Sequence, residues 1–112
     1  MSTITTHILD TSIGRPASGV TIILAKGSGG GWHTVGSGTT DIDGRCKSLV
    51  KGNAKLKKGT YRLTFGVASY FKRAGQTAFY PSVSVIFTVR DSRHHHVPLL
   101  LSPWGYSTYR GS

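Results

Sequence analysis

Alternation of apolar and polar side chains with a period of two constrains the fold of this chain more than any other feature. Tyr61, Leu63 and Phe65 share one face of an extended segment, while Arg62 and Thr64 share the other. A period of two is that of a strand with one buried face. Turn residues separate such runs at intervals of about 8–12 residues, as in β sandwiches. The pattern therefore predicts an all-β sandwich of seven to eight strands.

The expected strands follow one another with one short helix among them. They cover residues 3–10, 20–26, 32–40, 45–50, 59–67, 81–89, 94–102 and 107–110, with the helix at 69–75. Residues 14–16 are expected to break the first strand, and residues 27–31 to form a hairpin tip. Residues 41–44 should form a tight turn, because Asp and Gly accept the backbone angles that turns need. Since the chain shows no linker or internal repeat, residues 1–112 are interpreted as a single domain.

The single cysteine, Cys46, excludes a disulfide within the chain and is compatible with a reducing compartment. A chain of 112 residues can bury a core without disulfides or metal. The first residues carry no signal-peptide pattern, and no stretch approaches the roughly 20 apolar residues that span a membrane. We therefore expect a cytoplasmic protein with no membrane partner.

The net charge of +10 arises from 14 Lys and Arg against 4 acidic residues. Such a charge attracts polyanions and also steers small anions into a site. The basic residues are scattered, and the densest group, Lys51, Lys55, Lys57 and Lys58, surrounds an expected turn. Because neither an Arg-rich helix nor an aromatic RNA-binding signature accompanies them, we expect no nucleic-acid partner. A small anionic substrate fits the charge equally well.

The C-terminal segment is unusually apolar and aromatic for a chain end, from Val97 to Tyr109. Chain ends are commonly frayed and polar. An exposed apolar edge strand would invite pairing with a copy of itself. We therefore expect this segment to be docked on its own domain or on another subunit.

Three consecutive histidines, His94, His95 and His96, stand in an expected strand. Alternation places His94 and His96 on one face and His95 on the other. One interpretation is surface histidines, and another is a pair of zinc ligands. A zinc site needs a third ligand, for which Cys46 or His7 is only a guess. We expect no metal.

Two further residues are candidates for chemistry. His7 is expected at a half-exposed position of the first strand, where most histidines are structural. Arg45 follows the tight turn, and its guanidinium is either a solvated charge or a planar donor for an anionic, amide-rich ligand.

A histidine is the expected general base. The chain has only four acids, Asp10, Asp41, Asp43 and Asp91, and no two of them form an evident carboxylate pair. No Gly-x-Ser-x-Gly elbow of the serine hydrolases is present either. The pKa of histidine suits proton transfer near neutrality.

Several segments together resemble one family. The segment 94–112, ending Tyr-Arg-Gly-Ser, is similar to the hallmark C-terminus of the 5-hydroxyisourate hydrolases of the transthyretin-like family. The segments 5–11 (TTHILDT), 14–17, 43–45 and 79–81 match that family too. The resemblance extends over essentially the whole chain.

The resemblance implies a transthyretin-like two-sheet sandwich that assembles as a homotetramer, a dimer of dimers. Active sites would lie in a channel between the dimers. The implied reaction is hydrolysis of 5-hydroxyisourate to 2-oxo-4-hydroxy-4-carboxy-5-ureidoimidazoline in urate degradation, without a cofactor. The residues that match the catalytic ones are His7, Arg45 and His96, and those that match the substrate-binding ones are Tyr109, Arg110, Gly111 and Ser112.

The alternative interpretation is a transthyretin-like carrier of small molecules without catalysis. The thyroid-hormone carrier lacks a histidine matching His96 and the Tyr-Arg-Gly-Ser ending, and this chain has both. One departure from the enzymes is His95, where many members have Tyr. Because His95 should point away from His96, we expect little effect on chemistry.

Overall fold

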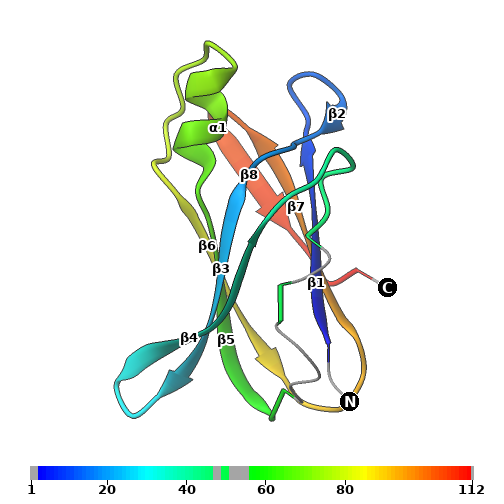
Figure 1. The fold of residues 1–112 in the computed structure, drawn as a ribbon, viewed down its shortest axis with the longest axis vertical. Coiled ribbons are helices and arrows are strands. Elements are labelled where there is room, and N and C mark those ends of the chain that lie inside the picture. Colours follow the sequence, from blue (N-terminus) through cyan, green and yellow to red (C-terminus); the bar gives the residue numbers. More distant parts are fainter. Residues whose placement is uncertain (1–2, 47–48, 51–55, 112) are drawn as a thin grey trace.

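Two four-stranded sheets form a sandwich in the computed structural model, which describes residues 3–46, 49–50 and 56–111 (Figure 1). The first sheet has the order β2-β1-β7-β8, and the second has the order β4-β3-β5-β6. Their bounds are β1 Ile4–Asp10, β2 Arg15–Pro16, β7 His95–Ser102 and β8 Gly105–Thr108, then β3 Thr21–Ser28, β4 Gly31–Thr39, β5 Gly59–Phe65 and β6 Val83–Val89. The helix α1, Val67–Arg73, connects β5 to β6. This architecture is the predicted all-β sandwich with one short helix.

The first and the seventh strand pair in parallel, although they lie at opposite ends of the sequence. Every other strand pair is antiparallel. The parallel register places Thr5 beside His96 and His7 beside Pro98. Residues from the two ends of the chain therefore meet on one sheet.

The core lies between the sheets and follows the alternation read from the sequence. Tyr61, Leu63 and Phe65 are fully buried, and Ile8 of β1 and Leu99 of β7 oppose them from the other sheet. Burying side chains of this size stabilises a fold by about 1.5–3 kcal/mol each. The core therefore fixes which face of each strand points outward.

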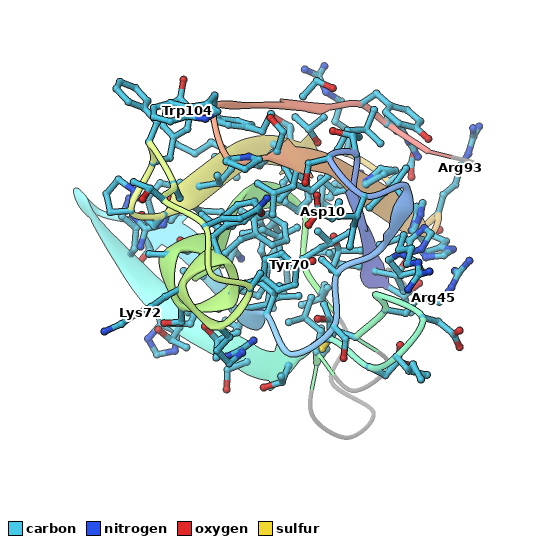
Figure 2. All side chains as sticks on the ribbon, turned by 90° about the horizontal axis from the view of Figure 1, so that it is seen from above. Asp10, Arg45, Tyr70, Lys72, Arg93 and Trp104 are labelled. Carbon is cyan, nitrogen blue, oxygen red and sulfur yellow. The ribbon has the colours of Figure 1, made fainter. Side chains whose placement is uncertain are left out.

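A buried carboxylate ties the helix to the first sheet. Asp10, at the end of β1, accepts hydrogen bonds from the Ser12 amide and hydroxyl and from the Tyr70 hydroxyl at 2.7 Å. Burial first, and then the Asp10 carboxylate, raise the pKa of Tyr70 to about 12. Figure 2 shows Asp10 and Tyr70 facing each other in the interior, whereas Arg45 lies at the rim.

The expected strand at 45–50 is wrong in the part that the structure describes. Arg45 forms only an isolated bridge to β1, and Leu49 and Val50 lie in a bend. The Asp41 carboxylate accepts from the Arg45 amide at 3.0 Å and the Asp41 amide donates to the Arg45 carbonyl at 2.8 Å, which closes the loop on itself. Lys47 and Ser48 lie outside the described residues.

Smaller boundaries also differ from the prediction, by one or two residues at most strands. The helix begins at Val67, two residues early, because Val67 and Phe71 anchor it in the core. The last strand is Gly105–Thr108, since Ser102 pairs with Gly105 across a tight hairpin. Arg15 and Pro16 form a two-residue strand where only a break was expected.

Among the described residues, no helix is long and apolar enough to cross a membrane.

Candidate active site

The outer face of the sheet that holds β1 and β7 carries the predicted histidines. Ile4, Thr6 and Ile8 point into the core, so Thr5 and His7 point outward. His95 and Val97 of β7 are buried in the same way, which turns His96 outward beside Thr5. His7 is half-buried, as its place in the strand predicted.

A tight turn presents Arg45 next to His7. Gly44 adopts a positive φ of 75°, and a Cβ atom there would collide with the Ile8 carbonyl oxygen. The loop can therefore approach β1 closely, and the Ile8 amide donates to the Gly44 carbonyl at 2.9 Å. The following residue, Arg45, forms an antiparallel bridge with His7 while its side chain stays exposed.

The C-terminal segment closes on His96 from the other side. The Gly111 amide donates to the His96 carbonyl at 2.8 Å, and a Cβ atom at Gly111 would collide with the His96 ring. The side chains of Tyr109 and Arg110 are exposed, and the Arg110 guanidinium donates to the His94 carbonyl at 3.4 Å. Ser112 lies outside the described residues.

His96 lies among positively charged or chargeable groups. Burial lowers the pKa of His96 below 6.5, and His94, Arg45 and His7 lower it further. The imidazole is therefore neutral at neutral pH, which a general base requires.

The hydroxyl of Thr5 lies between two imidazoles. Its Oγ1 is 2.8 Å from Nδ1 of His96 and 2.6 Å from Nε2 of His94. The centroids of the two rings are 6.1 Å apart. In the sequence Thr5 stands only within the TTHILDT motif, and nothing there indicates a role for it, although alternation places it on the face of His7.

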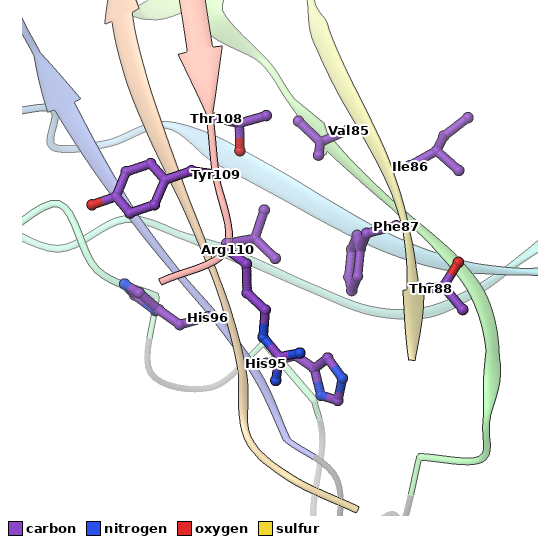
Figure 3. A pocket seen from close by; sticks show the side chains of 10 residues that line it. Val85, Ile86, Phe87, Thr88, His95, His96, Thr108, Tyr109 and Arg110 are labelled. Carbon is purple, nitrogen blue, oxygen red and sulfur yellow. The ribbon is translucent and has the colours of Figure 1, made fainter. Parts of the chain in front are cut away.

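His95 points to the opposite side of β7, as alternation predicted (Figure 3). It is only 4% exposed, and its Nδ1 donates to the Arg93 carbonyl at 2.7 Å. Its Nε2 lies 4.0 Å from the Asp91 carboxylate. His95 is therefore held inside the sandwich and takes no place on the face of His96.

A cavity of about 230 Å³ opens between β6, β7 and residues 108–110 (Figure 3). His96, Tyr109 and Arg110 line it, but His7 and Arg45 do not. In the described part of the chain, His7 and His96 are half-buried and Arg45 is exposed, so the face that gathers them is open to solvent.

Cys46, a third zinc ligand that the sequence left open, does not lie with the histidines in the described part of the chain. Cys46 is 4% exposed and packs in the core, against Gly38. Among the described residues, no three His, Cys, Asp or Glu are grouped so that they could hold a metal ion. The donors on the open face instead suit acid–base chemistry: two imidazoles to move protons and a guanidinium to bind oxygen atoms.

Comparisons with known proteins agree on one family. The model of the HIUase/Transthyretin family matches residues 4–111. The mouse 5-hydroxyisourate hydrolase is 45% identical, over 99% of this chain and 96% of its own length. The hydrolase of Deinococcus radiodurans is 47% identical, over 97% and 95%.

Solved structures show the same fold. The 5-hydroxyisourate hydrolase of Klebsiella pneumoniae superposes with a TM-score of 0.86 at 38% identity, covering all of both chains. Sea bream transthyretin in complex with thyroxine superposes with a TM-score of 0.90 at 31% identity, covering 96% of this chain and 93% of that one.

Proposed function

The chain belongs to the HIUase/transthyretin family, and from this premise we propose that it hydrolyses 5-hydroxyisourate to 2-oxo-4-hydroxy-4-carboxy-5-ureidoimidazoline. The observation that carries the proposal is the meeting of His7, Arg45 and His96 on one face from three separate segments. The compared hydrolases are 38–47% identical to this chain, whereas the compared transthyretin is 31% identical. The enzyme is thus favoured over the carrier.

The two histidines divide the proton transfers of the reaction. His96, neutral at neutral pH, takes a proton from water, whose oxygen forms a bond to the ring carbonyl carbon of the substrate. The carbon–nitrogen bond of the ring then breaks, and His7 supplies a proton to the leaving nitrogen. Help of this kind from a general base accelerates a reaction by about 10²–10⁴-fold. No cofactor takes part in the scheme.

Arg45 stabilises the negative charge that develops on the carbonyl oxygen. Its planar guanidinium can donate two parallel hydrogen bonds to urea-like oxygens. Removing one donor to such an oxyanion lowers kcat by about 10²–10³-fold in other hydrolases. Tyr109, Arg110 and Gly111 are the proposed substrate-binding residues beside His96, together with Ser112, which lies outside the described residues.

We further propose that residues 1–112 act as one hydrolase domain in a homotetramer, with the open face covered by a neighbouring dimer. The support is that this face is open to solvent in the described part of the chain, where Arg45 is exposed and His7 and His96 are half-buried, while catalysis benefits from the exclusion of water. The edge strands β6 and β8 also expose large apolar side chains, Ile86 at 60% and Tyr106 at 42%. The single buried Cys46 suits the reducing cytoplasm, where we place the protein.

A coupled ultraviolet assay tests the proposed function. Urate oxidase generates 5-hydroxyisourate in the cuvette, and its decay is followed with and without chelator-treated protein. We expect fast protein-dependent decay that falls at least about 100-fold in His96→Asn. The matched control is His33→Asn, which changes an exposed histidine on β4 and should leave the rate unchanged.

The outcome decides between the enzyme and the carrier. Decay at the spontaneous rate from a folded wild-type protein would contradict the hydrolase and favour a carrier. Normal turnover by His96→Asn would remove His96 from the reaction.

A further inference from the structure

Thr5 stands between the proposed base and a second histidine that the reaction scheme does not use. Its Oγ1 lies within hydrogen-bond distance of Nδ1 of His96 and of Nε2 of His94. The parallel register of β1 and β7 sets this arrangement, because Thr5 pairs directly with His96. The hydroxyl occupies Nδ1, so Nε2 is the ring nitrogen of His96 that is left for the substrate.

Proton counting limits what the three groups can do. A hydroxyl carries one hydrogen and a neutral imidazole carries one N–H, and each contact needs one hydrogen between its two heavy atoms. If the Thr5 hydrogen points to His94, Nδ1 of His96 must carry the proton and its Nε2 has a free lone pair. If the Thr5 hydrogen points to His96, the proton of His96 is on Nε2, which then cannot act as a base.

The surrounding charge favours the first arrangement. His96 lies close enough to Arg45, His7 and His94 for all three to act on its charge. A nearby cation attracts a nitrogen lone pair and repels an N–H group. It therefore favours the tautomer in which the ring nitrogen without a hydrogen-bond partner carries the lone pair. His94 is exposed and has its Nε2 on Thr5, so it can accept the hydroxyl hydrogen.

We propose that Thr5, with His94 as its acceptor, is a positioning residue that holds His96 in the Nδ1–H tautomer with a free Nε2. The chain of hydrogen bonds runs from Nδ1–H of His96 to Thr5, and from the Thr5 hydroxyl to Nε2 of His94. A histidine side chain without such a partner prefers the Nε2–H tautomer. The catalytic consequence rests on the proposed function, whereas the tautomer itself does not.

Nuclear magnetic resonance of protein with ¹⁵N-labelled histidine reads the tautomer directly, at about pH 8, where an ordinary histidine is neutral. Long-range proton–nitrogen correlations distinguish a protonated ring nitrogen from an unprotonated one, and His96→Asn assigns the signals. We expect protonated Nδ1 and unprotonated Nε2 for His96 in the wild type and in Thr5→Ser. In Thr5→Val the population should shift to Nε2–H. A wild-type His96 protonated on Nε2, or no shift in Thr5→Val, overturns the proposal.

Turnover of 5-hydroxyisourate supplies the second readout. Loss of a group that fixes the tautomer of a catalytic imidazole lowers kcat by up to about 10⁴-fold when that group is a carboxylate. For the neutral hydroxyl we expect Thr5→Val to lower kcat by about 10- to 100-fold with little change in KM, and Thr5→Ser to retain most of it. The matched control is Thr64→Val, which removes a hydroxyl of the second sheet that is hydrogen-bonded to Ser84 of the same sheet, and its kcat should be unchanged.

A double variant tests whether His94 acts through Thr5. Because both residues bias one equilibrium, Thr5→Val with His94→Ala should be no slower than Thr5→Val alone. Additive losses would separate His94 from the hydrogen-bond chain and overturn its part in the proposal. If the wild type has the expected tautomer but does not hydrolyse 5-hydroxyisourate, the proposed function fails while the positioning role of Thr5 stands.

Discussion

At the scale of single residues, the surroundings of His96 suit its proposed role as the base in a chain with only 4 acids. Burial and three neighbouring cationic or chargeable groups disfavour its protonated form. The sequence predicted the face on which His96 lies, because strand alternation decides it. It could not predict the contact with Thr5, since the two residues are 91 positions apart and only the fold joins them.

The lowered pKa of His96 predicts an active enzyme below the usual titration range of histidine. The acid limb of kcat/KM against pH should have its midpoint below 6.5, because His96 stays neutral there. The measurement is a pH–rate profile with urate oxidase kept in excess. A midpoint above 6.5 would contradict the assignment of His96 as the base.

The same shift predicts how His96 affects stability. The unfolded chain protonates His96 near pH 6.5, whereas the folded chain protonates it only at lower pH. Between these two pKa values the unfolded state binds more protons, so the contribution of His96 to stability rises with pH and is fully regained above 6.5. His96→Asn should flatten this rise, which urea unfolding at several pH values measures; an equally steep rise in the variant would assign it to other groups.

Replacing Arg45 by lysine separates the shape of the donor from its charge. We expect Arg45→Lys to lower kcat/KM by about 10²-fold, because an ammonium group cannot reproduce the planar pair of donors. Arg90→Lys, which changes an exposed arginine after β6, is the matched control. An unchanged kcat/KM in steady-state assays of Arg45→Lys would remove Arg45 from the site.

At the scale of elements, the site depends on segments that lie outside regular strands. At Gly44 and at Gly111 the backbone lies so close to neighbouring atoms that a Cβ atom would collide with them. The proposed site residue Arg45 follows Gly44, and the proposed site residue His96 pairs with Gly111. Alternation predicted the strands around them, with Ile8 and Leu63 in the core. It failed in the described part of residues 45–50, where hydrogen bonds of Asp41 close the loop and Arg45 pairs with His7 as an isolated bridge.

Adding one methyl group at Gly111 should disturb catalysis more than folding. The new Cβ atom would collide with the His96 ring and lie 3.2 Å from Cγ of Pro98, so the ring or the C-terminal segment must move. We expect Gly111→Ala to lower kcat/KM by about 10²-fold, as misplacement of a catalytic group by about 1 Å does, with a nearly unchanged melting temperature. In Gly31→Ala, where nothing lies within 4 Å of the added atom, both values should stay at wild type.

At the scale of the whole molecule, the open face and the edge strands β6 and β8 are the surfaces that the proposed assembly would use. Edge strands with apolar side chains pair with one another unless a charge prevents it. Strand alternation predicts only which side chains are buried within one chain. It cannot predict which surface contacts another copy, nor whether that copy encloses the site. The resemblance to the family supplied the tetramer as an expectation, and it remains a proposal.

A charge on the edge strand should take the assembly apart. We expect the wild type to sediment with about four times the mass of one 12.0 kDa chain, and Ile86→Lys to shift the population to smaller species. The smaller species should also lose activity if neighbouring copies enclose the site. Full activity in a monomeric variant would place the complete site within one chain.

The parallel pairing of β1 with β7 also delays the completion of the first sheet while the chain is synthesised on the ribosome. The partners Thr5 and His96 are separated by 91 residues, and a ribosome adds about 5–20 residues per second, so β1 waits roughly 5–18 s for its neighbour. Until then the edge of β1 that will pair with β7 has unpaired backbone groups, which can pair with other strands. Closing so long a loop also slows folding. The excess of positive charge can keep nascent copies apart during this delay, because like-charged chains repel one another.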